Sequence, residues 1–189
     1  MIKPAQLYAE ELKRLYCETW YDPKYIYYHS YTGTQELQFS DNNYERHSFA
    51  ILENNEVVGY ISYRLNWASK VTYNFGIISF KQSLVFGKDL MKIIDDIFMK
   101  YKMNKMEFYA FSDNPVIKHY YNFINRFGGR EVGILKESAL LMDGKLHDSV
   151  MFELFAKDYL FYKKFKKPSQ IKKDSILTYD TETYIISEK

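Results

Sequence analysis

Hydrophobic and polar positions follow two periods along this chain, and each period predicts one kind of element. Apolar residues recur every three to four positions over 4–20 and 88–101, so these stretches predict amphipathic helices. Runs in which apolar residues are continuous, or alternate with polar ones, predict strands. These strand runs are 48–52, 57–63, 71–80, 105–111, 131–142 and 146–155.

Turn and cap residues separate these runs. Asn54-Asn55 and Asp143-Gly144 each lie between two strand runs and predict hairpin turns. Asn114-Pro115 predicts the start of a further helix, because Asn is a good N-cap and Pro fits a first helical turn. Gly128 predicts the end of that helix. The order of elements predicts an α/β fold: a mixed sheet, parallel at its centre, with helices on both faces.

The chain has the length and the apolar content of one domain, with 189 residues of which 47% are hydrophobic. The composition changes after residue 156, where lysines and aromatic residues are followed by a mostly polar end. We therefore expect a domain over 1–156 and an appendage over 157–189. A solvated tail is the main interpretation, and packing through Tyr159, Phe161, Tyr162 and Phe165 is the alternative.

Composition excludes several classes of function. The net charge of +2 and the pI near 8.4 are too mild to imply a nucleic-acid or membrane partner. The single cysteine, Cys17, excludes an internal disulfide, and no apolar run approaches the ~20 residues that span a bilayer. The residues after Met1 lack the apolar core of a secretory signal, so a cytoplasmic setting is expected.

Motifs of other chemistries are absent from the sequence. It has no Walker loop, no Gly-x-Ser-x-Gly elbow and no Gly-x-Gly-x-x-Gly fingerprint. The four histidines, His29, His47, His119 and His147, lack the spacing of metal ligands. No metal site is therefore expected.

The most informative segment is 75–129, where an apolar strand turns into a helix and a second strand and helix follow. A helix that starts directly after a strand presents unpaired N–H groups and the positive end of its dipole, so it is suited to bind phosphate. The turn contains Gln82-x-x-Val85-x-Gly87, and Lys88 and Asp89 are expected to open the helix.

This turn resembles the Gln/Arg-x-x-Gly-x-Gly/Ala signature of the GCN5-related N-acetyltransferases (GNAT family), whose loop holds the pyrophosphate of acetyl-CoA. Val85 stands where the family usually has glycine. Asn114, Tyr121 and Gly128-Gly129 follow in the family's order: an Asn that opens a helix, a Tyr seven residues later that faces the cofactor thiol, and a terminating glycine. The resemblance covers 48–155.

The resemblance implies splayed central strands, acetyl-CoA as cosubstrate, and transfer of the acetyl group to an amine of a small molecule, protein or peptide. It also implies that a backbone N–H near 77–79 polarises the thioester carbonyl. The implied cofactor contacts are Ile77, Ile78, Ser79, Phe80, Gln82, Ser83, Leu84, Val85, Phe86, Gly87, Lys88 and Asn114.

Tyr121 is the candidate general acid, because a phenol with a pKa of ~10 stays protonated at neutral pH and can donate to a thiolate. Tyr120 is the second candidate. Core packing is the alternative for both, since Ile117, Tyr120, Tyr121 and Ile124 fall on one helical face.

The general base has no obvious counterpart, because 71–80 contains neither a carboxylate nor a histidine. One hypothesis is an acceptor amine of low pKa, which needs only a weak base. The other is a water relay to Asp22, Glu45 or Glu107.

Aromatic residues crowd 20–31, which predicts either a wall of the acceptor pocket or packing under a loop. A non-catalytic binding module of this fold is the alternative to an enzyme, because Val85 and the missing strand carboxylate depart from the family. A nucleic-acid accessory protein that uses the lysines of 163–173 is a third hypothesis.

Overall fold

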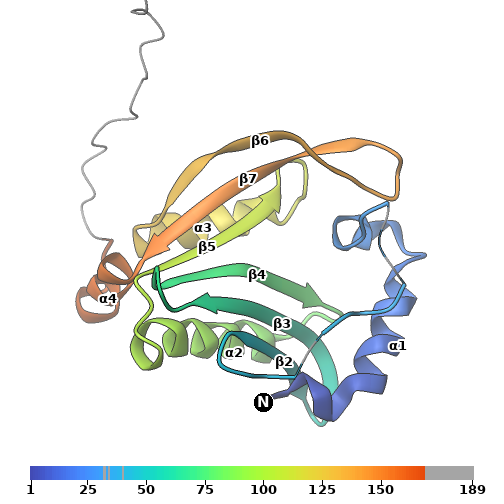
Figure 1. Cartoon of the computed structure of the whole chain (residues 1–189), viewed down its shortest axis with the longest axis horizontal. Coiled ribbons are helices and arrows are strands. Elements are labelled where there is room, and N and C mark those ends of the chain that lie inside the picture. The colour runs from blue at the N-terminus through green and yellow to red at the C-terminus, as the bar shows by residue number, and fades with distance from the viewer. Residues whose placement is uncertain (32, 34, 40, 169–189) are drawn as a thin grey trace, which may run out of the picture.

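A computed structural model describes residues 1–31, 33, 35–39 and 41–168, which form one seven-stranded sheet with the order β1-β2-β3-β4-β5-β7-β6 (Figure 1). Only the pair β4 and β5 is parallel, so the predicted mixed sheet is confirmed. The strands are β1 (Ile2–Pro4), β2 (Arg46–Glu53), β3 (Glu56–Asn66), β4 (Val71–Ser79), β5 (Lys105–Phe111), β6 (Arg130–Leu140) and β7 (Leu146–Phe155).

Four α-helices and three short helical segments connect or flank these strands. No helix in the described ranges is long and apolar enough to cross a membrane. The helices are η1 (Ala5–Tyr8), α1 (Ala9–Thr19), η2 (Pro23–Tyr28), α2 (Leu84–Asp95) with its π-helical extension η3 (Asp96–Lys100), α3 (Ile117–Phe127) and α4 (Ala156–Phe165).

The predicted turns are found, and two predicted helix starts are shifted. Helix α3 begins at Ile117, three residues after the predicted cap Asn114, whose side chain accepts from the Val116 N–H at 3.0 Å. Asn54 and Asn55 form the β2–β3 turn with φ of 50° and 65°, and Gly128 ends α3 with φ of 80°, a value that favours glycine. Helix α2 begins at Leu84, four residues before the predicted start at Lys88, because the Ser83 hydroxyl caps it by accepting from the Phe86 N–H at 3.0 Å.

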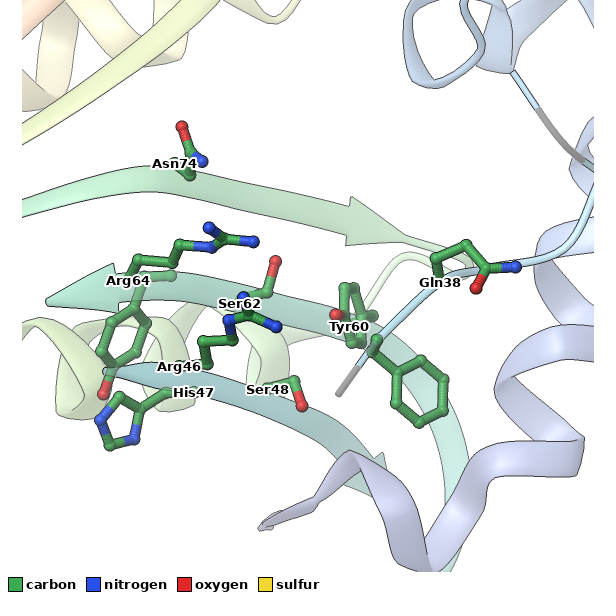
Figure 2. Close-up of a pocket in the computed structure, with 10 residues that line it drawn as sticks. Gln38, Arg46, His47, Ser48, Tyr60, Ser62, Arg64 and Asn74 are labelled. Carbon is green, nitrogen blue, oxygen red and sulfur yellow. The ribbon is translucent and has the colours of Figure 1, made fainter. Parts of the chain in front are cut away.

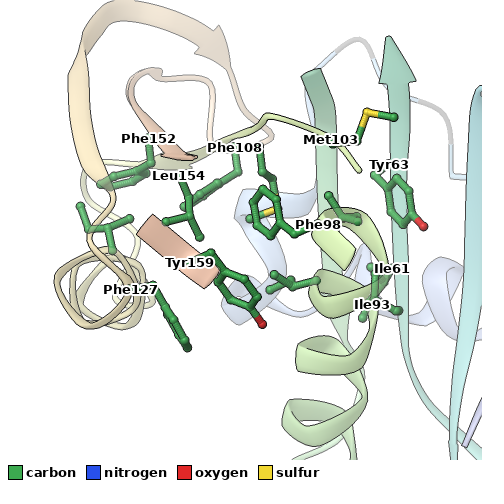
Figure 3. Packing of buried hydrophobic residues seen from close by; sticks show 14 of the residues in the cluster. Ile61, Tyr63, Ile93, Phe98, Met103, Phe108, Phe127, Phe152, Leu154 and Tyr159 are labelled. Carbon is green, nitrogen blue, oxygen red and sulfur yellow. The ribbon is translucent and has the colours of Figure 1, made fainter. Parts of the chain in front are cut away.

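Helices cover both faces of the sheet, as predicted. On one face, Ile93 and Phe98 of α2 and η3, Phe127 of α3 and Tyr159 of α4 share one core (Figure 3). On the other face, α1 packs against β2, β3 and β4 through a second cluster that includes Leu12, Leu15, Ala50, Tyr60 and Ile78.

Part of the predicted appendage is visible as helix α4. Tyr159 is fully buried, and its hydroxyl donates to Asp95 at 2.8 Å, while Lys163 donates to the same carboxylate at 2.9 Å. This segment therefore packs against α2. Residues 169–189, where the rest of the predicted appendage falls, lie outside the described residues.

The parallel strands β4 and β5 pair only at their first residues and then separate (Figure 1). The paired positions are Val71 with Lys105 and Thr72 with Met106. A bulge follows in β4: the register against β3 shifts between Ser62 and Arg64, and Asn74 has φ of 50°. A bulge bends its strand and increases the local twist, so it turns β4 away from β5.

Strand β6 forms one edge of the sheet and is irregular. Its register against β7 shifts between Glu131 and Gly133 and again between Leu135 and Ala139. At the second shift Glu137 has φ of 48°, and Asp148 of β7 accepts from its N–H at 2.9 Å. Asp148 also pairs with Lys136 at 2.8 Å, so one carboxylate holds this bulge.

Candidate active site

A cleft of about 940 Å³ opens where β4 and β5 separate. One wall is 75–79 of β4, the other is 108–111 of β5, and α3 contributes its first turns. The open end is crossed by the aromatic segment η2: Tyr25 donates to the Phe80 carbonyl at 3.0 Å, and Tyr27 donates to the Asp113 carbonyl at 3.0 Å. The predicted aromatic segment 20–31 therefore forms part of the cleft, through Lys24, Tyr27 and Tyr28.

The free edge of β4 carries backbone groups that face the cleft. The Ser79 N–H donates to the Tyr28 hydroxyl at 3.4 Å, whereas the Phe80 N–H donates to Val58 of β3 at 3.0 Å. Because successive N–H groups of a strand point to opposite edges, the N–H of Ile77 points into the cleft, as that of Ser79 does. The Ile77 N–H is therefore positioned to donate to a ligand, whereas the Ser79 N–H is already engaged by Tyr28.

The N-terminus of α2 supplies a second set of donors. The N–H groups of Leu84 and Val85 have no acceptor among the described residues, since Ser83 caps only Phe86. Phe86 locks this end of the helix to the sheet: a Cβ on Gly59 of β3 would lie 2.2 Å from its ring. A Cβ on Gly87 would meet nothing within 4 Å, so this turn is open on its outer side.

The structure brings some predicted cofactor residues into the cleft and leaves others outside it. Ile77, Ile78, Ser79, Phe86 and Asn114 line the cleft. The remaining predicted contacts belong to the turn before α2 and to its first turns: Phe80, Gln82, Ser83, Leu84, Val85, Gly87 and Lys88.

Lys88 and Asp89 were expected to open α2. They do not, because the helix already starts at Leu84. Asp89 is buried, with 2% of its surface exposed, and pairs with Lys92 at 2.6 Å. The burial of Asp89 raises its pKa, but the hydrogen bond to Lys92 and other cationic contacts outweigh this and lower it. The negative charge of Asp89 is therefore buried and neutralised by Lys92, one turn after the open N-terminus of α2.

The two candidate tyrosines of α3 face different surroundings. Tyr120 lines the cleft, its ring centroid lies 5.6 Å from that of Phe108, and its hydroxyl has no hydrogen-bond partner among the described residues. Burial, with a smaller effect of Tyr28, raises the pKa of Tyr120 to about 12. The Tyr121 hydroxyl instead donates to Glu131 at 2.7 Å, outside the cleft, and this hydrogen bond raises the pKa of Tyr121.

Sequence reasoning did not single out two tyrosines and a histidine at the cleft floor. Tyr16 and Tyr28 line the cleft, and the Tyr16 hydroxyl lies 3.2 Å from His29 Nδ1. His29 is buried, and its Nε2 lies 2.8 Å from the Thr19 hydroxyl. This burial lowers the pKa of His29. The density of aromatic residues in 20–31 was the available signal, because periodicity in α1 alone marks Tyr16 only as a core residue.

None of the three carboxylates considered for a water relay lines the cleft. Asp22 caps η2 and pairs with Lys24, Glu107 pairs with Lys105 at 2.6 Å, and Glu45 is exposed before β2. Among the described residues that line the cleft, none is Asp or Glu, and His119 is the only histidine. The described part of the chain also contains no cluster of three or more His, Cys, Asp or Glu suited to a metal ion.

A mixed sheet that opens between two parallel strands, beside a helix N-terminus that leaves the Leu84 and Val85 N–H groups free, is the fold and site of an acyltransferase. The sequence matches the profile of the "Acetyltransferase (GNAT) family" over residues 8–123, so this chain belongs to the GNAT family, whose cosubstrate is acetyl-CoA.

Solved structures agree with this fold. A structure described only as an acetyltransferase is 19% identical, has a TM-score of 0.63 and is matched over 86% of both chains. Spermidine/spermine N-acetyltransferase SpeG from Vibrio cholerae, solved with manganese ions, is 17% identical with a TM-score of 0.54, over 80% of this chain and 77% of that one. No curated protein matches the sequence.

Proposed function

We propose that this protein transfers the acetyl group of acetyl-CoA to an amine through the cleft between β4 and β5. The separation of β4 from β5 carries this proposal, because it leaves inward-facing N–H groups on a strand that ends beside the open N-terminus of α2. The cleft volume of about 940 Å³ suits a long, flexible thioester.

The pyrophosphate fits the N-terminus of α2. The free N–H groups of Leu84 and Val85 donate to it, and the helix dipole favours its charge. Val85 replaces the usual glycine, yet its contribution here is a backbone N–H, which every residue but proline has. Lys88 adds a positive charge in the next turn.

Tyr120 is the group we assign to the leaving sulfur. In the reaction a neutral amine nitrogen attacks the thioester carbon, the C–S bond breaks, and the sulfur takes the proton of the Tyr120 hydroxyl. The proton that the nitrogen loses returns through water to Tyr120, so one proton moves in net from nitrogen to sulfur. The N–H of Ile77 stabilises the carbonyl oxygen, and the Tyr120 hydroxyl donates to the sulfur. With a pKa of about 12, Tyr120 stays protonated at every pH at which the enzyme would work.

The cleft wall favours an acceptor amine of low pKa. No carboxylate among the described lining residues can take the proton of a strongly basic amine. An α-amine with a pKa near 7.7–8.0 is roughly 10–15% neutral at pH 7, whereas a lysine amine is about 0.04% neutral. Similar folds include spermidine N-acetyltransferases, which supports an amine acceptor in general.

Isothermal titration with acetyl-CoA tests the cofactor site without needing the acceptor. We expect micromolar binding to the wild type, and at least about 10-fold weaker binding to the double variant Val85→Asp, Gly87→Asp, because two carboxylates would repel the pyrophosphate. The space around Gly87 accommodates the new side chain.

The matched control is Val132→Asp, Gly133→Asp, which makes the same two changes on the exposed strand β6. It should bind acetyl-CoA as the wild type does. A folded wild type without acetyl-CoA affinity would reject the proposal and favour a non-catalytic binding module.

A further inference from the structure

A second pocket, of about 320 Å³, lies on the sheet face opposite α2 and adjoins the cleft (Figure 2). Tyr60, Ser62 and Arg64 of β3 line it from this face, and Tyr63, which also belongs to the α2 core, lines its edge. Its wall contains basic and neutral polar side chains, and none of its described lining residues is Asp or Glu.

Two arginines dominate this pocket. Arg46 of β2 and Arg64 of β3 are direct register partners, and Figure 2 shows both guanidinium groups extending over the strands near Ser62. Neither guanidinium has an ion pair or hydrogen bond with a described residue. Like charges directly opposite each other on paired strands destabilise a sheet, so this pair costs stability unless an anion lies between them.

The bulge of β4 adds a third polar group. Asn74 has φ of 50° at the bulge, lines the pocket, and its amide has no partner among the described residues. A bulge of this kind re-aims a side chain at a functional site. An amide donor and two planar guanidinium forks suit a carboxylate or phosphate group.

We propose that this pocket binds an anionic group, carboxylate or phosphate, carried by the acceptor amine. The inference rests on the proposed function. Gln38, Tyr60 and Ser62 line both the pocket and the cleft, so one ligand can occupy both. Ser62 pairs with Gly76 on the cleft wall, and Arg64 lies two residues further along β3, roughly 7 Å away. An acceptor with a short chain between its amine and its anionic group spans this distance. A polycationic amine would instead be repelled by the two guanidinium groups.

Inorganic phosphate tests the pocket by itself. The titration uses the Val85→Asp, Gly87→Asp background, so that phosphate is kept away from α2. We expect binding that is weakened about 10- to 100-fold by Arg46→Gln or Arg64→Gln, the range for losing hydrogen bonds between charged groups. Arg126→Gln, the same change on α3, should leave it unaltered. Equal phosphate affinity in all variants, or none in the parent, would overturn the proposal.

Matched amines then show whether the anion belongs to the acceptor. The pairs are glycylglycine with glycylglycinamide, and O-phosphoethanolamine with ethanolamine, assayed by release of the CoA thiol. We expect kcat/KM for at least one anionic member to exceed that of its neutral partner about 10-fold or more, and Arg64→Gln to remove this preference without changing acetyl-CoA affinity.

The outcomes separate the two proposals. Phosphate binding without any preference for the anionic amines would overturn the acceptor assignment and leave an independent anion site. Absence of acetyl-CoA binding by the wild type would reject the proposed acetyltransferase function. The phosphate titration would still decide whether Arg46 and Arg64 form an anion site.

Discussion

Helix α3 places two adjacent tyrosines about 100° apart around its axis, so its rotation decides which of them meets the cleft. Tyr120 shares a stripe with Ile124 and Phe127, both buried, and Tyr121 is left beside β6. The sequence predicted the helix and both candidates. It ranked Tyr121 first, because the rotation of α3 depends on contacts that the sequence does not reveal. One of them joins Phe127 to Tyr159 of the predicted appendage, with ring centroids 5.1 Å apart.

Replacing each hydroxyl in turn tests this assignment. Tyr120→Phe should lower kcat about 10²- to 10⁴-fold, the usual contribution of a general acid, with acetyl-CoA affinity nearly unchanged. Tyr121→Phe, its matched control, should retain kcat within about threefold. Steady-state kinetics with the best amine of a panel measures both, and a pH profile of the wild type should show no loss of a tyrosine proton below pH ~10. The reverse ranking of the two variants would instead make Tyr121 the acid.

Among the elements, α4 shows how a short helix can complete a core. Its sequence carries lysines beside aromatic residues, which is also the composition of a solvated tail. Tyr159 nevertheless packs 4.9 Å from Phe98 and reaches Asp95 with its hydroxyl. Burial, followed by the hydrogen bond to Asp95, raises the pKa of Tyr159. Neither contact could be inferred from periodicity, because both partners lie far away in the chain.

The contribution of α4 to stability can be measured by urea unfolding. Tyr159→Ala should lower the free energy of unfolding by about 3–5 kcal/mol, since it removes a fully buried aromatic ring. Leu160→Ala, on the same helix but 41% exposed, should cost less than about 1 kcal/mol. A loss below about 1 kcal/mol for Tyr159→Ala would mean that α4 does not belong to the core in solution.

Across the whole molecule, His147 connects three segments that lie far apart in the sequence. Its Nδ1 lies 2.8 Å from Asp113, in the loop before α3, and its Nε2 lies 3.1 Å from Asp143 in the β6–β7 turn. Its ring also contacts Tyr27 of η2 edge-on at 6.0 Å. The burial of His147 alone would lower its pKa, but the hydrogen bonds to Asp143 and Asp113 outweigh it, so the pKa is raised.

The stability of this connection should depend on pH. Because the pKa of His147 is higher in the folded state than the unfolded value of ~6.5, its contribution is fully present below pH ~6.5 and is lost as pH rises through the folded pKa. His147→Gln should therefore lower Tm by roughly 1–4 °C near pH 6 and by less at pH 9. His119→Gln, at an exposed position of α3, is the matched control. A Tm difference that stays constant from pH 6 to 9 would contradict this role.

The order of strands and helices from 46 to 155 followed from period and turn residues, and the fold class was correct. Sequence reasoning missed β1, whose three residues are too few to show a period, and the 3₁₀ turn η1 at the start of the predicted first helix. It also missed the pocket at Arg46 and Arg64. Their opposition depends on the register between β2 and β3, and side-chain period alone does not reveal it.

The irregular edge strand β6 affects how copies of this protein behave together. Val132, Ile134 and Leu135 are 47–51% exposed on it, and an apolar open edge is what lets sheets grow from one molecule to the next. Such growth needs an unbroken row of backbone donors and acceptors. The bulge at Glu137 interrupts that row, and Lys136 places a charge beside the gap. Two molecules that meet along β6 can share only a short ladder, so this edge disfavours open-ended assembly of sheets.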